Sequence, residues 1–357
     1  MKLNKIEALR RFALEGDKFG TFLVFNSVNL TYFAGFQGAA ALSVTQSEEP
    51  ILYVSSVNYE QAKTEVKDFT IELLKSGDKL MEKMAKRSAP SKKIAVDSLP
   101  IESWRVLATA IGGEERLEPA GNIIRGLRMV KDQQELGLIR EACNLANLGM
   151  KVASENIHSG MKEREIAAEV EYAMRKNGSD GTSFDTIIAS GPSSAFPHGS
   201  CGNRTIRDGD FVIVDLGATY QFYRSDMTRT FVAGNPTEKQ KKIYETVKLA
   251  NQEAFETIKP NVSAAKVDMA ARRIIESEGF GEFFVHSLGH GVGLEIHEAP
   301  VLGPDSKDVL ARGNTITDEP GIYLPGYGGV RIEDTVLVTE ESAEKLTKRF
   351  YTLTDAS

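Results

Sequence analysis

The sequence predicts an α+β protein of two domains, a smaller α/β domain over residues 1–125 and a larger one over residues 126–357. Two observations lead to this prediction. In the first third of the chain, β-rich runs alternate with helix-periodic segments, which is typical of layered α/β domains. Between residues 131 and 340, the order of two helices followed by strands occurs twice, although no residue-level repeat accompanies it. That order would suit two related halves that face each other across a central cleft.

The smaller domain is predicted to begin with an amphipathic helix over residues 4–15, because Leu3, Ile6, Leu9 and Phe12 recur at helical spacing before Gly16. Five short strands are expected at 21–25, 39–45, 51–55, 69–73 and 94–96. Helices are expected near 57–67, 78–87 and 101–111. This alternation predicts three layers around a mixed sheet.

The larger domain follows a connection that Pro119, Gly121 and Gly126 indicate. A long helix with an apolar stripe is expected over about 131–157, and a second over 163–176 that stops at Asn177 and Gly178. Strands are expected at 186–189, 211–216 and 228–232. A second pair of helices is expected at 237–258 and 264–278, again followed by strands.

Composition excludes several classes of protein. The chain has 357 residues, 41% of them hydrophobic and 26% charged, with a formal net charge of −7. Both signs of charge are interspersed, so no basic surface for nucleic acid is expected. No stretch approaches the roughly 20 apolar residues that span a bilayer. Cys143 and Cys201 are too few for a disulfide scaffold, which favours a reducing cytoplasm.

The residues best suited to metal binding or catalysis lie between Val285 and Glu333. This stretch holds three of the five histidines, namely His286, His290 and His297. Glu319 and Glu333 follow in short β-like runs bounded by glycines. Upstream, two aspartates complete the set: Asp215, which follows four apolar residues, and Asp226, which lies in a polar run. One imidazole and four carboxylates presented from strands suit two hard or borderline divalent cations.

Each signal has a structural alternative. A carboxylate such as Asp215 is costly to bury unpaired, so either a metal or an ion pair would have to compensate. Asp226 alone resembles a turn aspartate that could pair with Arg224 or Arg229. Strand alternation places Arg331 and Glu333 on one face, where they could form an ion pair.

The glycines around His290 (Gly289, Gly291 and Gly293) allow close backbone approach, which makes an ordinary structural histidine less expected there. Paired cysteines that would mark a structural zinc site are missing from the sequence. His297 also does not begin a His-Glu-x-x-His motif, because position 301 is valine.

At these residues the sequence resembles the metal-dependent pita-bread peptidases, which comprise methionine aminopeptidase, aminopeptidase P and prolidase. The segment from Asn26 to Phe36 is similar to one in the amino-terminal domain of the creatinase, prolidase and aminopeptidase P branch. The resemblance covers nearly the whole chain. It implies a carboxy-terminal pita-bread catalytic domain and a smaller creatinase-type domain in front of it.

The resemblance also implies roles for individual residues. Asp215 would chelate one metal, Asp226 and Glu333 would bridge two, and His290 and Glu319 would bind the second. His198 and His297 match the two histidines of the catalytic cleft, although His198 alone would more often be a plain loop residue. The remaining matches are His286, which would support His290 from the second shell, and Tyr223 and Arg331, which would line the site.

The implied mechanism uses two divalent ions per subunit, with manganese expected and cobalt, zinc or iron as alternatives. A hydroxide that bridges them would attack the scissile carbonyl carbon, with Glu319 as general base. His297 would stabilise the oxyanion, and His198 would assist the leaving nitrogen.

The expected substrates are short proline-containing peptides, cut at the Xaa-Pro bond. Dipeptidases of this branch can carry an arginine where this chain has Val301. That difference keeps aminopeptidase P as the alternative to the favoured dipeptidase. A creatinase-like hydrolase without metal and a non-catalytic binding protein are remoter alternatives, and the intact ligand set argues against both. The resemblance also implies a homodimer.

Overall fold

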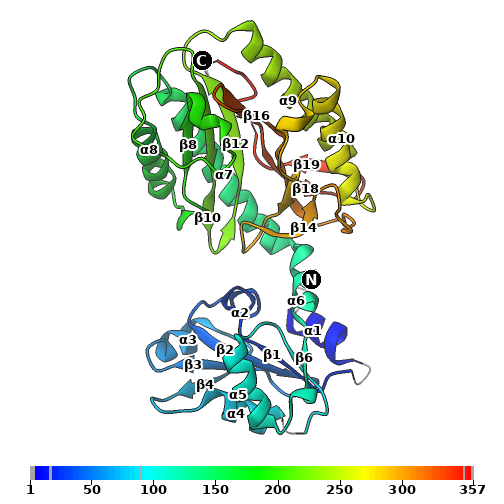
Figure 1. Cartoon of the computed structure of the whole chain (residues 1–357). Coiled ribbons are helices and arrows are strands. Elements are labelled where there is room, and N and C mark those ends of the chain that lie inside the picture. Colours follow the sequence, from blue (N-terminus) through cyan, green and yellow to red (C-terminus); the bar gives the residue numbers. More distant parts are fainter. Residues whose placement is uncertain (1–4, 16–17, 89, 349, 355–357) are drawn as a thin grey trace. The chain divides into compact units, whose positions relative to one another are not determined.

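The computed structural model describes residues 5–15, 18–88, 90–348 and 350–354. The chain divides into two compact units, Met1–Arg128 and Met129–Ser357 (Figure 1). In the described part of the chain, no helix is both long enough and apolar enough to cross a membrane.

A six-stranded mixed sheet forms the centre of the first unit, in the order β4-β3-β2-β1-β5-β6. Its strands are β1 (Thr21–Val24), β2 (Ala39–Thr45), β3 (Ile51–Ser55), β4 (Thr70–Leu74), β5 (Ile94–Val96) and β6 (Leu117–Pro119). β2 pairs antiparallel with β1 and β3, whereas β4, β5 and β6 join by parallel pairing. The predicted mixed sheet is confirmed, with β6 as an additional edge strand.

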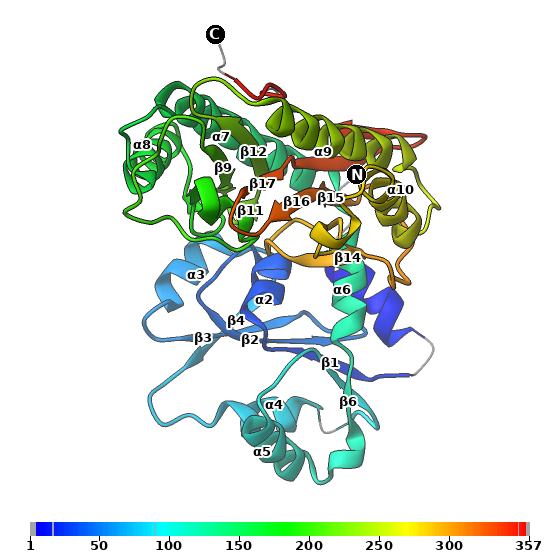
Figure 2. The ribbon, with the colours of Figure 1, turned by 45° about the horizontal axis from the view of Figure 1, so that its top comes forward.

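Helices cover both faces of this sheet, as Figure 2 shows. The principal helices are α2 (Ser27–Ala34), α3 (Tyr59–Glu65), α4 (Leu80–Ser88), α5 (Ile101–Ile111) and α6 (Gly121–Met129), with a short 3-10 turn η2 (Glu114–Arg116). α4 and α5 lie together on one side, where Met84 and Leu107 pack with Leu23 and Val96 of the sheet. α2 and α3 lie on the other side, which gives the three predicted layers.

One local prediction in this unit was wrong, and another was right in extent but not in helix type. The connection expected around Gly121 and Gly126 is the helix α6, which forms because Ile124 and Arg128, one turn apart, are both buried. The first predicted helix begins as α1 (Lys5–Leu9) and continues as a π-helical segment, η1 (Arg10–Leu14). The wider π turn shifts the register, so Phe12 is exposed. Leu3 and Gly16 lie outside the described residues.

The second unit contains two helix pairs, each followed by strands, as predicted. The helical elements are α7 (Gln133–Asn156), α8 (Glu163–Lys176), η3 (Gly191–Ala195), α9 (Glu238–Thr257), α10 (Ala264–Ser277) and η4 (Gly281–Phe283). α7 begins at a capping box, because the Asp132 side chain accepts from the backbone of Gln134 and Glu135 while the Glu135 carboxylate accepts from the Asp132 N–H. Figure 1 shows α8 and the α9–α10 pair on opposite outer sides, with strands between them.

The strands of the second unit form several small sheets. The first half contributes β7 (Gly181–Thr182), β8 (Ile187–Ser190), β9 (Phe211–Leu216), β10 (Ala218–Tyr220), β11 (Tyr223–Arg224) and β12 (Met227–Val232). The second half contributes β13 (Gly289–Gly291), β14 (Glu298–Leu302), β15 (Thr315–Asp318), β16 (Gly321–Leu324), β17 (Gly328–Arg331), β18 (Asp334–Val338) and β19 (Ala343–Lys345).

Each half has its own hydrophobic core. α7 and α8 pack on β8, β9 and β12, and α9 and α10 pack on strands β14 to β18. The halves join where Thr228 of β12 forms an isolated antiparallel bridge with Glu333. Thr230, two residues further along β12, exchanges hydrogen bonds with the backbone of Arg331. This junction brings the carboxylate-bearing ends of both halves together.

Candidate metal centre

His290 lies on β13, a short strand that the glycines on either side allow to pack closely. A Cβ atom at Gly289 would overlap the Thr317 carbonyl, and one at Gly291 would overlap the Ala299 carbonyl. The His290 backbone N–H donates to the Thr317 hydroxyl at 3.0 Å. The glycines therefore let β14 and β15 approach β13 from both sides, which fixes the imidazole between them.

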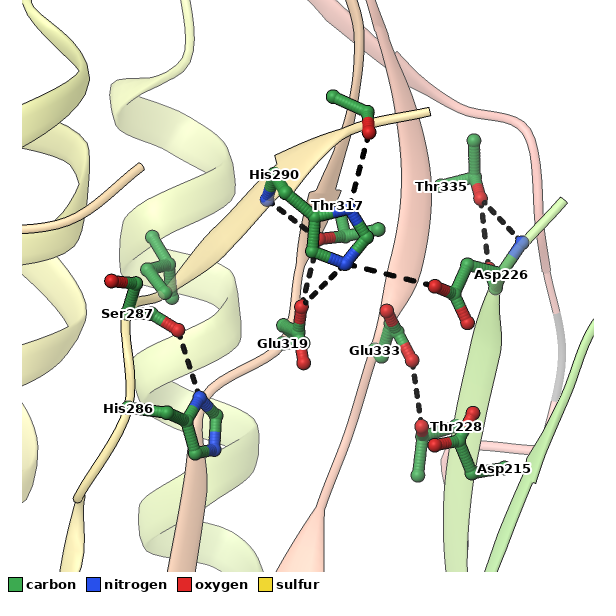
Figure 3. Close-up of polar contacts among 12 residues, drawn as sticks. Asp215, Asp226, Thr228, His286, Ser287, His290, Thr317, Glu319, Glu333 and Thr335 are labelled. Atoms are coloured by element: carbon green, nitrogen blue, oxygen red, sulfur yellow. Dashed lines mark hydrogen bonds and ion pairs between the residues drawn. The ribbon is translucent and has the colours of Figure 1, made fainter. Parts of the chain in front are cut away.

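Three further donors surround the His290 ring (Figure 3). Its Nε2 atom lies 3.2 Å from Oε1 of Glu319 and 3.7 Å from Oδ2 of Asp226. Asp226, His290 and Glu333 each offer one ligand atom within 4.8 Å of the others. Because these residues come from β13, from the end of β15 and from the junction of β12 with β17, the fold itself brings them together.

Thr228 and Thr317 orient two of these carboxylates. The Thr228 hydroxyl donates to Oε2 of Glu333 at 2.6 Å, and the Thr228 carbonyl accepts the Glu333 N–H at 3.0 Å. The Thr317 hydroxyl donates to Oε1 of Glu319 at 3.0 Å. Bonds of this kind hold ligand oxygens in fixed directions.

Asp215 completes the group from β9, whose six residues are all buried. Its Oδ2 accepts from the Arg331 guanidinium at 2.6 Å, whereas its Oδ1 is buried without a hydrogen-bond partner. Arg331 therefore pairs with Asp215. The alternative of an Arg331–Glu333 ion pair is not the pairing observed, because the chain leaves β17 at Arg331 and Glu333 instead joins Thr228.

The electrostatics of the group are those of negative charges crowded in a buried space. Burial raises the pKa of Asp215, and burial together with the neighbouring carboxylates raises the pKa of Asp226 and of Glu333 well above its ordinary value. Burial alone would lower the pKa of His290, but its hydrogen bond to Glu319 and the nearby carboxylates outweigh burial and raise it to about 9. The same hydrogen bond outweighs burial at Glu319 and lowers its pKa to about 2.

These residues fit divalent cations. The unpartnered Oδ1 of Asp215 and the raised pKa values of three carboxyl groups both show negative charge without enough positive charge to balance it. Oxygen donors with one imidazole suit manganese, iron, cobalt or zinc, since no thiolate is among them. The structure thus brings together all five predicted ligands, and their assignment as ligands stays a prediction.

The two predicted cleft histidines are both exposed. His297 lies just before β14, and its ring centroid is 4.3 Å from that of His290. Partial burial of the ring lowers the pKa of His297, and the neighbouring His290 and His198 lower it further. His198 lies in the turn after η3, where the Pro197 carbonyl accepts from Arg331 at 3.2 Å. Arg331 therefore contacts both Asp215 and the loop that carries His198.

His286 and Tyr223 lie further from the carboxylates. His286 Nε2 is 2.9 Å from the Tyr323 hydroxyl, and Arg331 donates to the same hydroxyl at 2.8 Å. His286 thus reaches the centre through Tyr323 and Arg331 rather than through His290. Figure 3 shows the His286 side chain apart from His290 and beside Ser287. The hydroxyl of Tyr223 donates to Glu135 of α7 at 2.7 Å. Its role in lining the site stays a prediction.

Sequence reasoning missed Thr228, Thr317 and Tyr323, which hold the predicted residues in place. Thr228 and Thr317 each lie close in sequence to a predicted carboxylate ligand, since Thr228 follows Asp226 by two and Thr317 precedes Glu319 by two. Such threonines in a β-rich run are common without any special role, so this signal alone is weak.

Comparisons with known proteins identify the family of the chain. Residues 137–340 match the sequence profile of Metallopeptidase family M24, and residues 5–130 match that of the creatinase/prolidase N-terminal domain. The chain belongs to the M24 family of metallopeptidases and carries the additional N-terminal domain of its creatinase and prolidase members. The predicted fold class and family are confirmed.

Relatives match along nearly the whole chain. An Xaa-Pro dipeptidase of Pyrococcus furiosus is 41% identical over 345 residues, which cover 96% of this chain and 97% of the relative. The prolidase from Pyrococcus horikoshii has a similar structure, with a TM-score of 0.91, 41% identity and coverage of 98% and 99% of the two chains. An X-Pro aminopeptidase from Thermotoga maritima is also similar, with a TM-score of 0.86, 34% identity and coverage of 95% and 98%.

Proposed function

We propose that the protein hydrolyses Xaa-Pro bonds of short peptides, principally dipeptides, with two divalent ions held by Asp215, Asp226, His290, Glu319 and Glu333. The observation that carries this proposal is the convergence of all five donors, three of them with a raised carboxyl pKa. The named dipeptidase and prolidase relatives support the choice of bond. Divalent ions at this site would supply Lewis acidity and an activated water near neutral pH.

The protein's own residues then have distinct tasks. Glu319 is the carboxylate that we assign as general base, because the Thr317 hydroxyl orients its Oε1 atom at 3.0 Å beside the proposed ions. Arg331 fixes Asp215 through the 2.6 Å bond, which keeps one oxygen of that carboxylate free of the guanidinium. The hydroxyls of Thr228 and Thr317 keep the carboxylates of Glu333 and Glu319 oriented during the reaction.

The exposed histidines are placed to contact substrate. The lowered pKa of His297 keeps its imidazole neutral at neutral pH, so it can donate a hydrogen bond to the oxygen of the scissile carbonyl. His198 lies in the loop whose Pro197 carbonyl accepts from Arg331, and we assign it to the leaving proline nitrogen. Because both side chains are exposed, both imidazole rings can reach a bound peptide from their present positions.

One observation favours a second candidate, an Xaa-Pro aminopeptidase that acts on longer peptides. Val301 of β14 is the cross-strand partner of His290, so both side chains lie on the same face of the sheet. Val301 is 43% exposed, so it presents an apolar surface beside the metal centre where a cation could have bound a dipeptide carboxylate. The similar X-Pro aminopeptidase keeps this candidate open.

The test compares Ala-Pro with Ala-Pro-Ala as substrates after metal has been removed with a chelator and manganese added back. Manganese-restored cleavage of Ala-Pro alone would establish the dipeptidase. Preferential cleavage of Ala-Pro-Ala would establish the aminopeptidase and agree with the apolar Val301 surface. If neither peptide were cleaved under any metal, the Xaa-Pro assignment would be wrong.

Three finer features belong to the same proposal. Manganese is the proposed ion from the family resemblance, since the donors themselves suit manganese, iron, cobalt and zinc alike, and metal analysis of the purified protein tests it. A homodimer is proposed from the family resemblance, and light scattering tests it. A reducing cytoplasm is proposed because Cys143 and Cys201 are both free thiols, and fractionation of cells tests it.

A further inference from the structure

The position of His297 is not set by contacts of its own ring. The side chain is exposed, and within the described residues its ring forms no hydrogen bond to another residue. Its edge-to-face approach to His290, at 4.3 Å between centroids, is a weak restraint. The backbone of the loop over residues 292–298 must therefore place the imidazole.

Glu298, the next residue, anchors this loop in the protein interior. Its Oε1 atom lies 2.7 Å from Nζ of Lys131, and the two side chains are 6% and 1% exposed. In a buried ion pair, water cannot replace either partner, so separating the two charges is costly. The pair therefore restrains both side chains strongly. Because Glu298 and His297 are adjacent, the pair restrains the backbone of His297.

The loop is folded around the Glu298 carboxylate. A Cβ atom at Gly293 would lie 2.5 Å from Oε1 of Glu298, so only glycine leaves room for the carboxylate there. The Gly293 N–H donates to the Glu295 carbonyl at 3.0 Å, which closes the turn. From the other side, Arg224 donates to the carbonyls of Gly293 and Leu294. The third glycine of the His290 segment therefore serves the Glu298 side chain.

Lys131 is itself held in a fixed place. Its N–H donates to the Gly313 carbonyl at 2.9 Å, and Asn314 donates to the Met129 carbonyl at 2.9 Å. Gly313 and Asn314 lead directly into β15, the strand that ends next to Glu319. Lys131 thus joins the loop of His297 to the strand before Glu319.

We propose that Lys131 and Glu298 act as positioning residues that hold His297 over the metal centre for catalysis. This inference rests on the proposed role of His297 in binding the scissile carbonyl oxygen. Neither Lys131 nor Glu298 would touch the substrate, since both side chains are buried. Loss of the pair would displace His297 while leaving all five proposed metal ligands in place.

The principal variant is the double substitution Lys131→Met with Glu298→Gln, which removes both charges of this pair together. We expect kcat for Ala-Pro, or for Ala-Pro-Ala if that is the substrate, to fall roughly 10- to 100-fold. KM and manganese content should change little, because the lost interaction acts in the transition state. Gly293→Ala is a second variant, since it keeps both charges and displaces the Glu298 carboxylate; we expect the same pattern.

The decisive comparison repeats the double substitution in a His297→Ala background. If the pair acts through His297, the double substitution should cost little further activity there. An equal fold-loss in both backgrounds would show a general structural role and overturn the proposal. If His297→Ala alone kept full activity, the role of His297 and its positioning would both fail, whereas metal-dependent cleavage of the Xaa-Pro bond would stand.

Discussion

Asp318 and Asp334 are directly opposed partners of the antiparallel strands β15 and β18, yet of their two carboxylates only that of Asp334 is hydrogen-bonded. Both carboxyls are fully buried. The groups that contact the Asp334 carboxylate are Arg229, Lys345, Thr347 and Tyr351. Neither carboxylate oxygen of Asp318 has a hydrogen-bond partner, and burial raises the pKa of this carboxyl well above the ordinary value. At Asp334, Arg229 and Lys345 outweigh burial and lower the pKa of the carboxyl.

The two aspartates should therefore respond to mutation in opposite ways. We expect Asp318→Val to raise the free energy of unfolding by about 1–3 kcal/mol, because it replaces an unsatisfied buried group with an apolar residue suited to a strand. Asp334→Asn should lower it by about 3–5 kcal/mol, because Arg229 is left buried without its anion. Urea unfolding of both variants measures this. A loss of stability in Asp318→Val as large as that in Asp334→Asn would contradict the assignment.

Removing a proposed bridging ligand should abolish activity and metal binding together. We expect Asp226→Ala or Glu333→Ala to lower activity by more than about 100-fold, the upper range for losing an outer-shell partner of a metal site. Metal content should fall in parallel. Glu344→Ala is the matched control, because it removes a carboxylate that pairs with Arg140 on the surface. Full activity in either ligand variant would show that two bridged ions are not needed.

The stability of the metal-free protein should fall as the pH rises from 6.5 to about 9. His290 has an ordinary pKa of 6.5 in the unfolded chain and about 9 in the folded protein. A group whose pKa is raised on folding stabilises the protein below the unfolded value, and this contribution is lost as the pH rises through the folded value. The shift corresponds to roughly 3 kcal/mol. The raised pKa values of Asp226 and Glu333 act in the same direction.

Urea unfolding in the presence of a chelator, at pH 6.5 and pH 9, measures this effect. His290→Ala should reduce the difference between the two pH values, because the contribution of the imidazole is gone and only that of the carboxyl groups remains. Saturating manganese should also reduce it, since metal binding requires the neutral imidazole. Equal stability of the metal-free protein at both pH values would mean that His290 is not protonated in the folded state.

Much of the fold could be predicted from local pattern. β2, β3 and β5 have the predicted bounds because β-branched and apolar runs there are bounded by turn residues. Asp132 and Glu135 explain the start of α7 in the same local way. α2 is not predicted as a helix, because Thr31, Tyr32 and Phe33 are residues that favour strands. The helix forms because their burial in the fold outweighs this local propensity.

The site could be predicted only in part for a different reason. The ligand types and their glycine-bounded positions are visible in the sequence, so all five proposed donors could be named. The partner of Arg331 could not, because Asp215 is 116 residues away and strand alternation pointed to Glu333. Asp318 was also missed, since nothing local distinguishes it from an exposed aspartate that precedes a ligand.

The bridge between Thr228 and Glu333 joins segments 105 residues apart. Ions held by Asp215 and Asp226 of the first half and by His290, Glu319 and Glu333 of the second half would act as a reversible cross-link between the two halves of the larger unit. A cross-link across a long loop restricts the unfolded chain and suppresses partial opening. Release of the ions would thus loosen β12 from the strands of the second half. The reaction centre would therefore also stabilise the contact between the two halves.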